Sequence, residues 1–109
     1  MKAPFERLAA LDRLIHEPAR LSILTAVSAC ESADFLFLQR LTGLTKGNLS
    51  SHLAKLEQAG LVEITKEFVG KVTRTTVGLT PEGRDAIASH WRTLEELSRD
   101  VKNWQPSEE

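Results

Sequence analysis

The chain has 109 residues, of which 41% are hydrophobic and 27% charged, and this size and balance predict a single folded domain over residues 1–109 rather than a disordered chain. It contains no uninterrupted apolar stretch of the kind found in signal peptides or membrane-spanning helices, and its single cysteine, Cys30, cannot form an internal disulfide. We therefore expect a cytoplasmic protein without a membrane partner.

The net charge of −1 hides an uneven distribution. Residues 40–75 carry six basic and three acidic side chains, whereas the segments on either side are net acidic. A polyanion such as a nucleic acid needs one basic face, not a basic protein. A window with this small excess is common on protein surfaces, so charge alone does not identify the partner.

The first part of the chain has the apolar spacing of three helices. A stripe of apolar residues three and four apart predicts a helix over about 4–16, and Pro18 suits the first turn of a second helix. Residues 31–34 form a polar break. The apolar run at 35–41 then predicts a short third helix, preceded by one or two extended residues.

The stretch from Gly43 to Gly60 predicts a tight turn followed by a fourth helix over 45–59. Thr45 can cap its N-terminus, since a threonine hydroxyl accepts from the free N–H groups of the first turn. Gly60 suits the left-handed residue that often follows a helix. One face of this helix is apolar and should point into the core; it consists of Leu49, Leu53 and Leu56.

After Gly60 the apolar period changes from helical to two. Residues 61–68 and 72–79 predict two strands joined by a turn at 69–71, which together form a hairpin, or wing, at 61–79. Thr80 and Pro81 then open a last helix that extends to about residue 104. The predicted fold class is mainly α with a small β-hairpin: a winged helix–turn–helix whose core spans about 18–83.

Five segments of the chain resemble the small winged-helix transcriptional regulators grouped with the MarR and ArsR families. They read PARLSIL at 18–24, LTKGNLSSHL at 44–53, LEQAGLV at 56–62, RT at 74–75 and LTPEGR at 79–84. Their order and spacing carry the resemblance, which runs from about residue 8 to residue 97. The resemblance implies a dimer formed by terminal helices, about 4–16 and 81–104, that binds a near-palindromic site in double-stranded DNA.

The chain departs from these families at two kinds of position. Val77 and Gly78 stand where relatives often have an aromatic or charged residue. We still expect the wing to form, but its rigidity does not follow from the resemblance. The cysteine pairs of the metal-sensing ArsR-type regulators are missing, and His16, Cys30, His52 and His90 show no metal-type spacing. We expect neither a metal nor a cofactor.

We expect the exposed face of helix 45–59 to enter the major groove. That face is small and polar near its N-terminus, and a helix fits a groove only when its leading residues are not bulky. Helix N-terminal N–H groups also favour phosphate. The predicted DNA contacts on this helix are Lys46, Asn48 and Ser51 in the groove, Ser50 and Lys55 nearer the backbone, and Gly47 as a point of close approach.

Some of these residues also have an ordinary structural explanation. Asn48 and Ser50 are residue types that can cap their own helix. Gly47 is tolerated in a first helical turn at a cost of about 1 kcal/mol or less. His52 lies partly inward and is better explained as a packed histidine than as a base reader.

Three basic residues belong to the wing. Lys71 is next to the turn glycine and should project furthest, and Arg74 suits a narrow minor groove. Lysines also protect the exposed edges of hairpins, and that role explains Lys66 equally well. We therefore predict DNA contacts for Lys71 and Arg74.

The terminal helices predict a homodimer. Two tryptophans on one exposed stripe would leave an apolar patch that soluble monomers rarely carry, unless the chain buries it alone. A symmetric pair would place two recognition helices about 34–36 Å apart, one turn of duplex DNA. The predicted interface consists of Leu8, Leu11, Ile15, Trp91, Leu94, Val101 and Trp104.

Together these features predict a sequence-specific DNA-binding transcriptional regulator that acts as a repressor. The sequence shows no catalytic triad and no glycine-rich phosphate loop, so we predict no catalytic residue and no enzyme. The alternative is a winged-helix protein-interaction module that binds no DNA. A small-molecule effector fits a cleft between the terminal helices and the winged core, although no residue pattern demands it.

Overall fold

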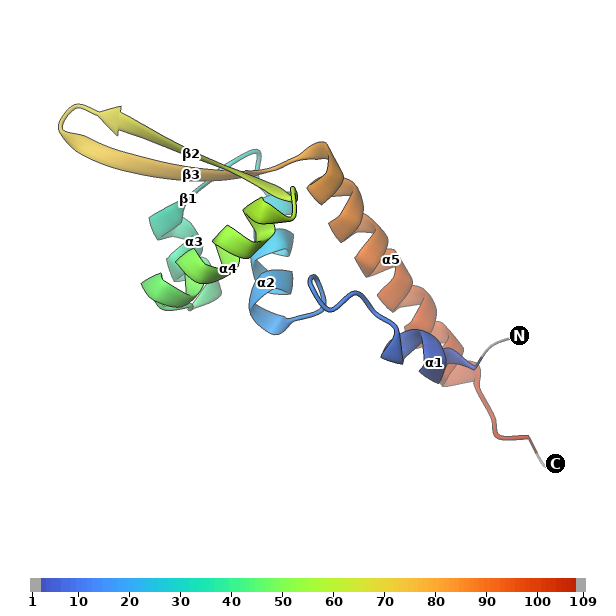
Figure 1. Ribbon diagram of the computed structural model, residues 1–109. Coiled ribbons are helices and arrows are strands. Elements are labelled where there is room, and N and C mark those ends of the chain that lie inside the picture. The colour runs from blue at the N-terminus through green and yellow to red at the C-terminus, as the bar shows by residue number, and fades with distance from the viewer. Residues whose placement is uncertain (1–2, 108–109) are drawn as a thin grey trace.

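The computed structural model describes residues 3–107, so the first two and last two residues of the predicted domain lie outside it. Helices α2 (Pro18–Ser28), α3 (Phe35–Thr42) and α4 (Lys46–Gln58) gather beside a hairpin, and α5 (Pro81–Asn103) leads away from them (Figure 1). Helix α1 (Pro4–Ala9) lies against the far end of α5. Within residues 3–107, no helix has both the length and the apolarity needed to cross a membrane.

The sheet has three antiparallel strands in the order β1 (Ala33–Asp34), β3 (Val72–Leu79), β2 (Val62–Val69). Strands β2 and β3 pair from Val62↔Leu79 to Val69↔Val72 and form the predicted wing. The extended residues expected before the third helix form β1, which pairs with β3 through Ala33↔Val77 and Asp34↔Thr76. The predicted fold class is therefore confirmed, with one additional short strand.

The helix predicted over 4–16 is wrong in its second half, because α1 ends at Ala9. The Asp12 carboxylate accepts a hydrogen bond from the backbone N–H of Leu14 at 2.9 Å, and the N–H of His16 donates to the Asp12 carbonyl at 2.7 Å. Aspartate favours this kind of local turn over a helix interior. The turn directs Ile15 into the core.

The predicted helix boundaries around α4 are confirmed. The Thr45 hydroxyl accepts from the N–H of Asn48 at 3.1 Å. Gly60 has a φ of 79°, and beside it the N–H of Leu61 donates to the Leu56 carbonyl, which is the Schellman ending of a helix. Gly43, with a φ of 73°, makes the turn between α3 and α4.

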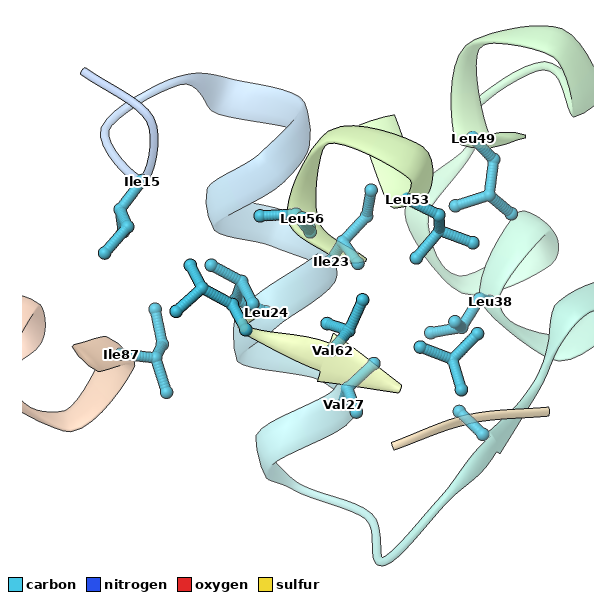
Figure 2. Close-up of a cluster of buried hydrophobic side chains, with 13 residues drawn as sticks. Ile15, Ile23, Leu24, Val27, Leu38, Leu49, Leu53, Leu56, Val62 and Ile87 are labelled. Carbon is cyan, nitrogen blue, oxygen red and sulfur yellow. The ribbon is translucent and has the colours of Figure 1, made fainter. Parts of the chain in front are cut away.

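The core lies between the helix–turn–helix and the wing (Figure 2). The three leucines of α4 are buried, as predicted, against α2, α3 and the base of the sheet. Ile15 and Ile87 extend this cluster toward α5. The buried residues that pack around the α4 leucines include Ile23, Leu24, Val27, Leu38, Val62 and Val77.

Gly83 lets the first turn of α5 approach the start of the wing. A Cβ placed at Gly83 would lie 1.9 Å from the Leu61 carbonyl oxygen, a contact that no side-chain rotation can relieve. At Gly47 on α4, by contrast, a Cβ would meet nothing within 4 Å.

We expect Gly83→Ala to lower the free energy of unfolding by about 3 kcal/mol, the upper end for overpacking, because the methyl group must displace backbone. Gly47→Ala is the matched control and should raise it by about 0.5–1 kcal/mol, since alanine is the better helix former. Urea unfolding at one protein concentration measures both. Equal stability of the Gly83 variant and the wild type would contradict the close approach.

Candidate nucleic-acid interface

Helix α4 presents a polar face to solvent while its leucines are buried behind it. The Thr45 side chain takes the N-cap position, and within residues 3–107 the side chains of Asn48 and Ser50 make no hydrogen bond. The capping explanation for these two residues is therefore not supported. The structure exposes together all six predicted contacts of this helix: Lys46, Gly47, Asn48, Ser50, Ser51 and Lys55.

One flank of α4 faces the wing across a groove of about 320 Å³. Lys46, Ser50 and Ala54 line it from the helix, and Ile64 and Lys66 line it from β2. Side chains alternate along a strand, so Lys66 lies on the same face of the hairpin as the core-facing Ile64. Lys66 is not among the predicted contacts, although its spacing of two residues from Ile64 is the signal that places it here.

The other two predicted wing residues lie away from this groove. Lys71 is exposed in the turn that follows Gly70, which has a φ of 67°. Arg74 is exposed and pairs with Glu67 across the two strands of the hairpin. Lys66 pairs with Thr75, one position along, so Arg74 and Lys66 lie on opposite faces of the hairpin. The role of Arg74 in a minor groove stays a prediction.

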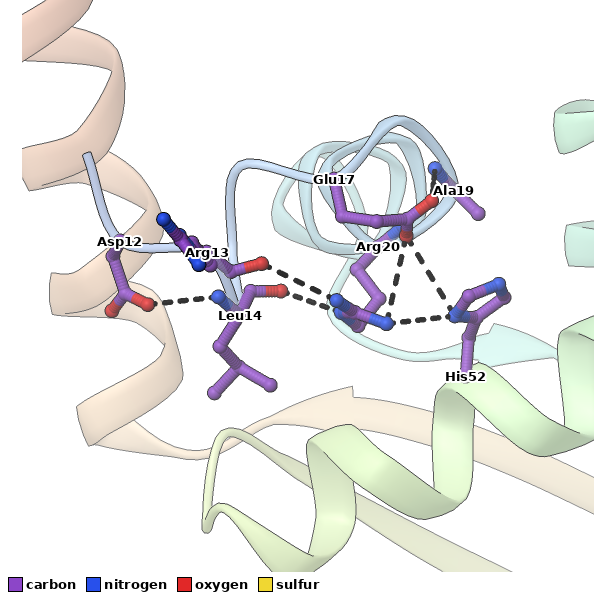
Figure 3. Close-up of polar contacts among 7 residues, drawn as sticks. All are labelled: Asp12, Arg13, Leu14, Glu17, Ala19, Arg20 and His52. Carbon is purple, nitrogen blue, oxygen red and sulfur yellow. Dashed lines mark hydrogen bonds and ion pairs between the residues drawn. The ribbon is translucent and has the colours of Figure 1, made fainter. Parts of the chain in front are cut away.

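The second flank of α4 packs on the start of α2 through His52 (Figure 3). Its Nδ1 lies 3.2 Å from Nη1 of Arg20 and 3.7 Å from Oε2 of Glu17. His52 lies partly inward, as predicted, since 21% of its side chain is exposed. The partners of this histidine, Glu17 and Arg20, were not identified from the sequence.

The terminal helices pack on each other within one chain. The ring of Phe5 meets that of Trp104 edge-on, with 4.9 Å between the ring centroids, and Arg7 forms an ion pair with Asp100. The Trp91 indole N–H donates to the Thr25 hydroxyl at 3.0 Å, which joins α5 to α2 as well. Several apolar side chains of this region nevertheless stay exposed, namely Phe5, Leu8, Trp91, Val101 and Trp104, each at 39–46%.

A cleft of about 460 Å³ lies between the α1–α2 connection and α5. At its wall, Nδ1 of His16 lies 3.1 Å from Nε2 of His90. The cleft is close to the position predicted for a small-molecule site, between the terminal helices and the winged core. Its lining combines apolar and polar side chains, including Arg7, Leu11, Asp12, Ile15, Ser89 and His90.

Burial lowers the pKa of His90, and the nearby His16 lowers it further, although Asp12 raises it in part. The folded protein therefore resists protonation of His90 more than the unfolded chain does. Among residues 3–107, no group of three or more His, Cys, Asp or Glu side chains is arranged to hold a metal ion.

We expect the stability contributed by a neutral His90 to be present above the ordinary histidine pKa, about 6.5, and lost as the pH falls through the lowered value. Thermal unfolding between pH 7.5 and 5.5 should show a decrease in Tm that is smaller in the variant His90→Gln. The same decrease in both proteins would mean that His90 does not titrate in this way.

The fold and the polar face of α4 define a class of protein: a helix–turn–helix module with a wing and terminal helices. A family model described as a winged helix DNA-binding domain matches residues 19–98. The chain belongs to this winged helix DNA-binding domain family. An uncharacterized protein of Methanocaldococcus jannaschii is 30% identical over 90 residues, which cover 83% of this chain and 98% of the relative.

Solved structures have the same fold. A transcriptional regulator homologue from Pyrococcus horikoshii is 26% identical with a TM-score of 0.81, over 92% of this chain and 98% of that one. A MarR family regulator from Silicibacter pomeroyi, 21% identical, has a TM-score of 0.64 over 94% and 65% of the two chains. The resemblance found in the sequence is confirmed: this is a DNA-binding transcriptional regulator with a MarR-like winged-helix fold.

Proposed function

We propose that the protein is a homodimeric repressor that binds a near-palindromic duplex site, with α4 of each protomer in the major groove. The observation that carries this proposal is the exposed, uncovered polar face of α4, which is fixed in orientation by three buried leucines. Occupation of promoter DNA by such a dimer would block transcription.

The residues on the polar face of α4 fall into two groups, those that can contact base edges and those that can contact phosphates. Lys46, Asn48 and Ser51 are offered to base edges, and Ser50 and Lys55 to phosphates, in accord with the ordinary division between contacts that specify and contacts that position. Open space surrounds Gly47, so the duplex backbone can approach the helix closely there.

The wing completes the interface on the flanking backbone or minor groove. Lys71 at the tip and Arg74 on β3 keep the roles inferred from the sequence. Lys66 joins them, because it faces the groove between the wing and α4 and so lies beside any duplex that α4 enters.

Dimerisation through α1 and the C-terminal half of α5 would cover the apolar side chains left exposed there. Leu8 and Val101 border one shallow hollow with the partly buried Leu94, which makes this side of α5 the centre of the proposed interface. Leu11, Trp91 and Trp104, which do not line this hollow, keep the interface role inferred from the sequence. Ile15 is only 5% exposed, so it supports the interface from within the protomer rather than touching a partner.

The cleft beside His90 supports a small-molecule effector. Two proteins of similar fold are described with small aromatic acids: BpsR of Bordetella bronchiseptica, whose DNA binding is regulated by 6-hydroxynicotinic acid, and NadR in complex with 4-hydroxyphenylacetate. They are 15% and 18% identical to this chain, with TM-scores of 0.70 and 0.65.

One observation favours the alternative function, a protein-interaction module without DNA binding. The outer face of α3 exposes Leu36, Phe37 and Leu41 at 40–62%. Apolar residues of this kind suit a protein partner. They lie on α3 and leave the polar face of α4 open, so DNA binding remains the better-supported function.

Selection of bound sequences from a random duplex pool tests the function directly. We expect a palindromic consensus with half-sites one helical turn apart, and a steep loss of affinity between 50 and 200 mM salt because phosphate contacts release counterions. Substitution of Asn48 or Ser51 should alter base preference, by about 1–3 kcal/mol per good contact. No enrichment of any duplex would favour the interaction module.

The salt slope is the steepness with which the logarithm of the binding constant falls with the logarithm of the salt concentration. Replacing a wing cation that contacts a phosphate with alanine should lower this slope by about 1 per protomer. We expect this for Lys66→Ala and Lys71→Ala, measured by fluorescence anisotropy at several salt concentrations. For Arg74→Ala, which faces the other side of the hairpin, an unchanged slope would refute a phosphate contact.

A charge placed in the proposed dimer interface should separate the protomers. We expect Val101→Glu and Leu8→Glu to give monomers in sedimentation velocity, because burying an unpaired carboxylate is costly. Val72→Glu is the matched control: it places the same charge on an exposed valine of the wing, so it should leave the dimer intact. Dimers that survive both α1 and α5 substitutions would rule out this interface.

A further inference from the structure

His52 occupies an unusual place on α4, because it belongs to the DNA-reading helix yet is mostly buried. Asn48 lies one turn before it and Lys55 one turn after it, so the three residues form the flank of α4 that faces the start of α2. This flank adjoins the buried leucines, which keeps His52 back from the most exposed line of the helix.

Arg20 determines which nitrogen of His52 carries the proton. A guanidinium group has only donors, so at 3.2 Å from Nη1 of Arg20 the Nδ1 atom of His52 must accept. The proton of the neutral ring is then on Nε2. A proton on Nδ1 would face the Arg20 cation directly.

Arg20 is itself held by the connection between α1 and α2. Its Nε donates to the Leu14 carbonyl at 2.6 Å, its Nη2 to the Arg13 carbonyl at 3.3 Å, and its Nη1 lies 3.7 Å from Oε2 of Glu17. Only 12% of its side chain is exposed. Every nitrogen of the guanidinium therefore has a partner inside the protein, and the ring of His52 is oriented before any ligand arrives.

The Nε2–H of His52 points away from this cluster (Figure 3). Within residues 3–107, Nε2 has no hydrogen-bond partner, and no buried side-chain nitrogen or oxygen is left unsatisfied. The Nε2 atom therefore reaches solvent as a free, directed donor.

The neighbouring groups indicate what this donor would bind. The N-terminus of α2 would ordinarily attract a phosphate, but the Glu17 carboxylate already accepts from the N–H groups of Ala19 and Arg20 at 3.1 and 2.9 Å. Burial alone would raise the pKa of Glu17, but the two N–H hydrogen bonds and the Arg20 cation lower it and the net shift is downward, so the carboxylate is charged. Among the described residues, the side-chain donors that remain on this flank are the Nε2–H of His52, the amide of Asn48 and the ammonium group of Lys55, and of these only the His52 donor is held in a fixed direction from behind.

We propose that His52 donates its Nε2–H to a backbone phosphate of the bound duplex, and that Arg20 is the positioning residue that fixes the imidazole for this contact. The proposal rests on the DNA binding proposed above and adds an imidazole N–H donor to it. The phosphates that border a major groove run along the flanks of a helix lying in it, where His52 is placed.

The first test compares variants on a duplex obtained by selection. At pH 8, where an imidazole is ordinarily neutral, His52→Ala should weaken binding about tenfold per protomer, the value of a hydrogen bond to a charged group, and the salt slope should stay unchanged because a neutral donor displaces no counterion. His52→Gln keeps an N–H at a similar reach and should restore most of the affinity. Lys55→Ala is the matched comparison, and it should lower the slope by about 1 per protomer.

Wild-type affinity in His52→Ala overturns the proposal, and so does a slope that falls as it does in Lys55→Ala. Equal losses in the Ala and Gln variants overturn it as well. Circular dichroism and Tm of each variant separate these outcomes from loss of folding.

The second test concerns Arg20 and needs no DNA. Nitrogen-15 NMR of the free full-length protein should show His52 as the Nε2–H tautomer in the wild type and as a mixture in Arg20→Lys. Arg20→Lys should also weaken DNA binding, but add little to His52→Ala, because both act through one ring. An Nδ1–H tautomer in the wild type overturns the positioning role of Arg20, and so do losses of DNA affinity that add up in the double variant. Wild-type protein that shows the Nε2–H tautomer but binds no duplex overturns the proposed DNA binding instead.

Discussion

The burial of Leu49, Leu53 and Leu56 determines what the rest of the molecule can do. These side chains have almost no exposed surface and pack between α2, α3 and the base of the sheet. Three residues on one helical face fix the rotation of the helix about its axis, so the opposite, polar face must point outward. Turning the helix would expose leucine surface at a cost of about 1.5–3 kcal/mol for each side chain.

A second constraint joins α4 to the wing and to α5. The Thr80 hydroxyl donates to the Gly60 carbonyl at 2.6 Å, the N–H of Thr80 donates to the Leu61 carbonyl at 3.1 Å, and Gly83 packs against that same residue. The end of α4 and the beginning of α5 are therefore held in one tight joint. If α5 carries the dimer interface, this joint transmits the geometry of the dimer to the two recognition helices.

Local signals in the sequence predicted most of this architecture. The caps at Thr45 and Thr80 and the glycine at position 60 depend on neighbours within a few residues, and they are confirmed. The end of α1 was missed because the turn around Asp12 competes with a helix whose apolar spacing continues past it. The contacts of Arg20 with His52, which is 32 residues away, have no local pattern at all. Strand alternation places Lys66 on the same face as Ile64, but the protection of a hairpin edge explains a lysine at this position equally well, and only the groove beside α4 distinguishes the two.

The segment between α1 and α2 connects two features that are distant in the sequence. Leu11, Asp12 and Ile15 line the cleft against α5, while the carbonyls of Arg13 and Leu14 hold the Arg20 side chain that contacts α4. A continuous set of contacts thus runs from the cleft to the recognition helix. A ligand in the cleft alters DNA binding only if it favours one arrangement of this segment over another. The carbonyls of Arg13 and Leu14 are the groups whose displacement would release Arg20, and with it the orientation of His52.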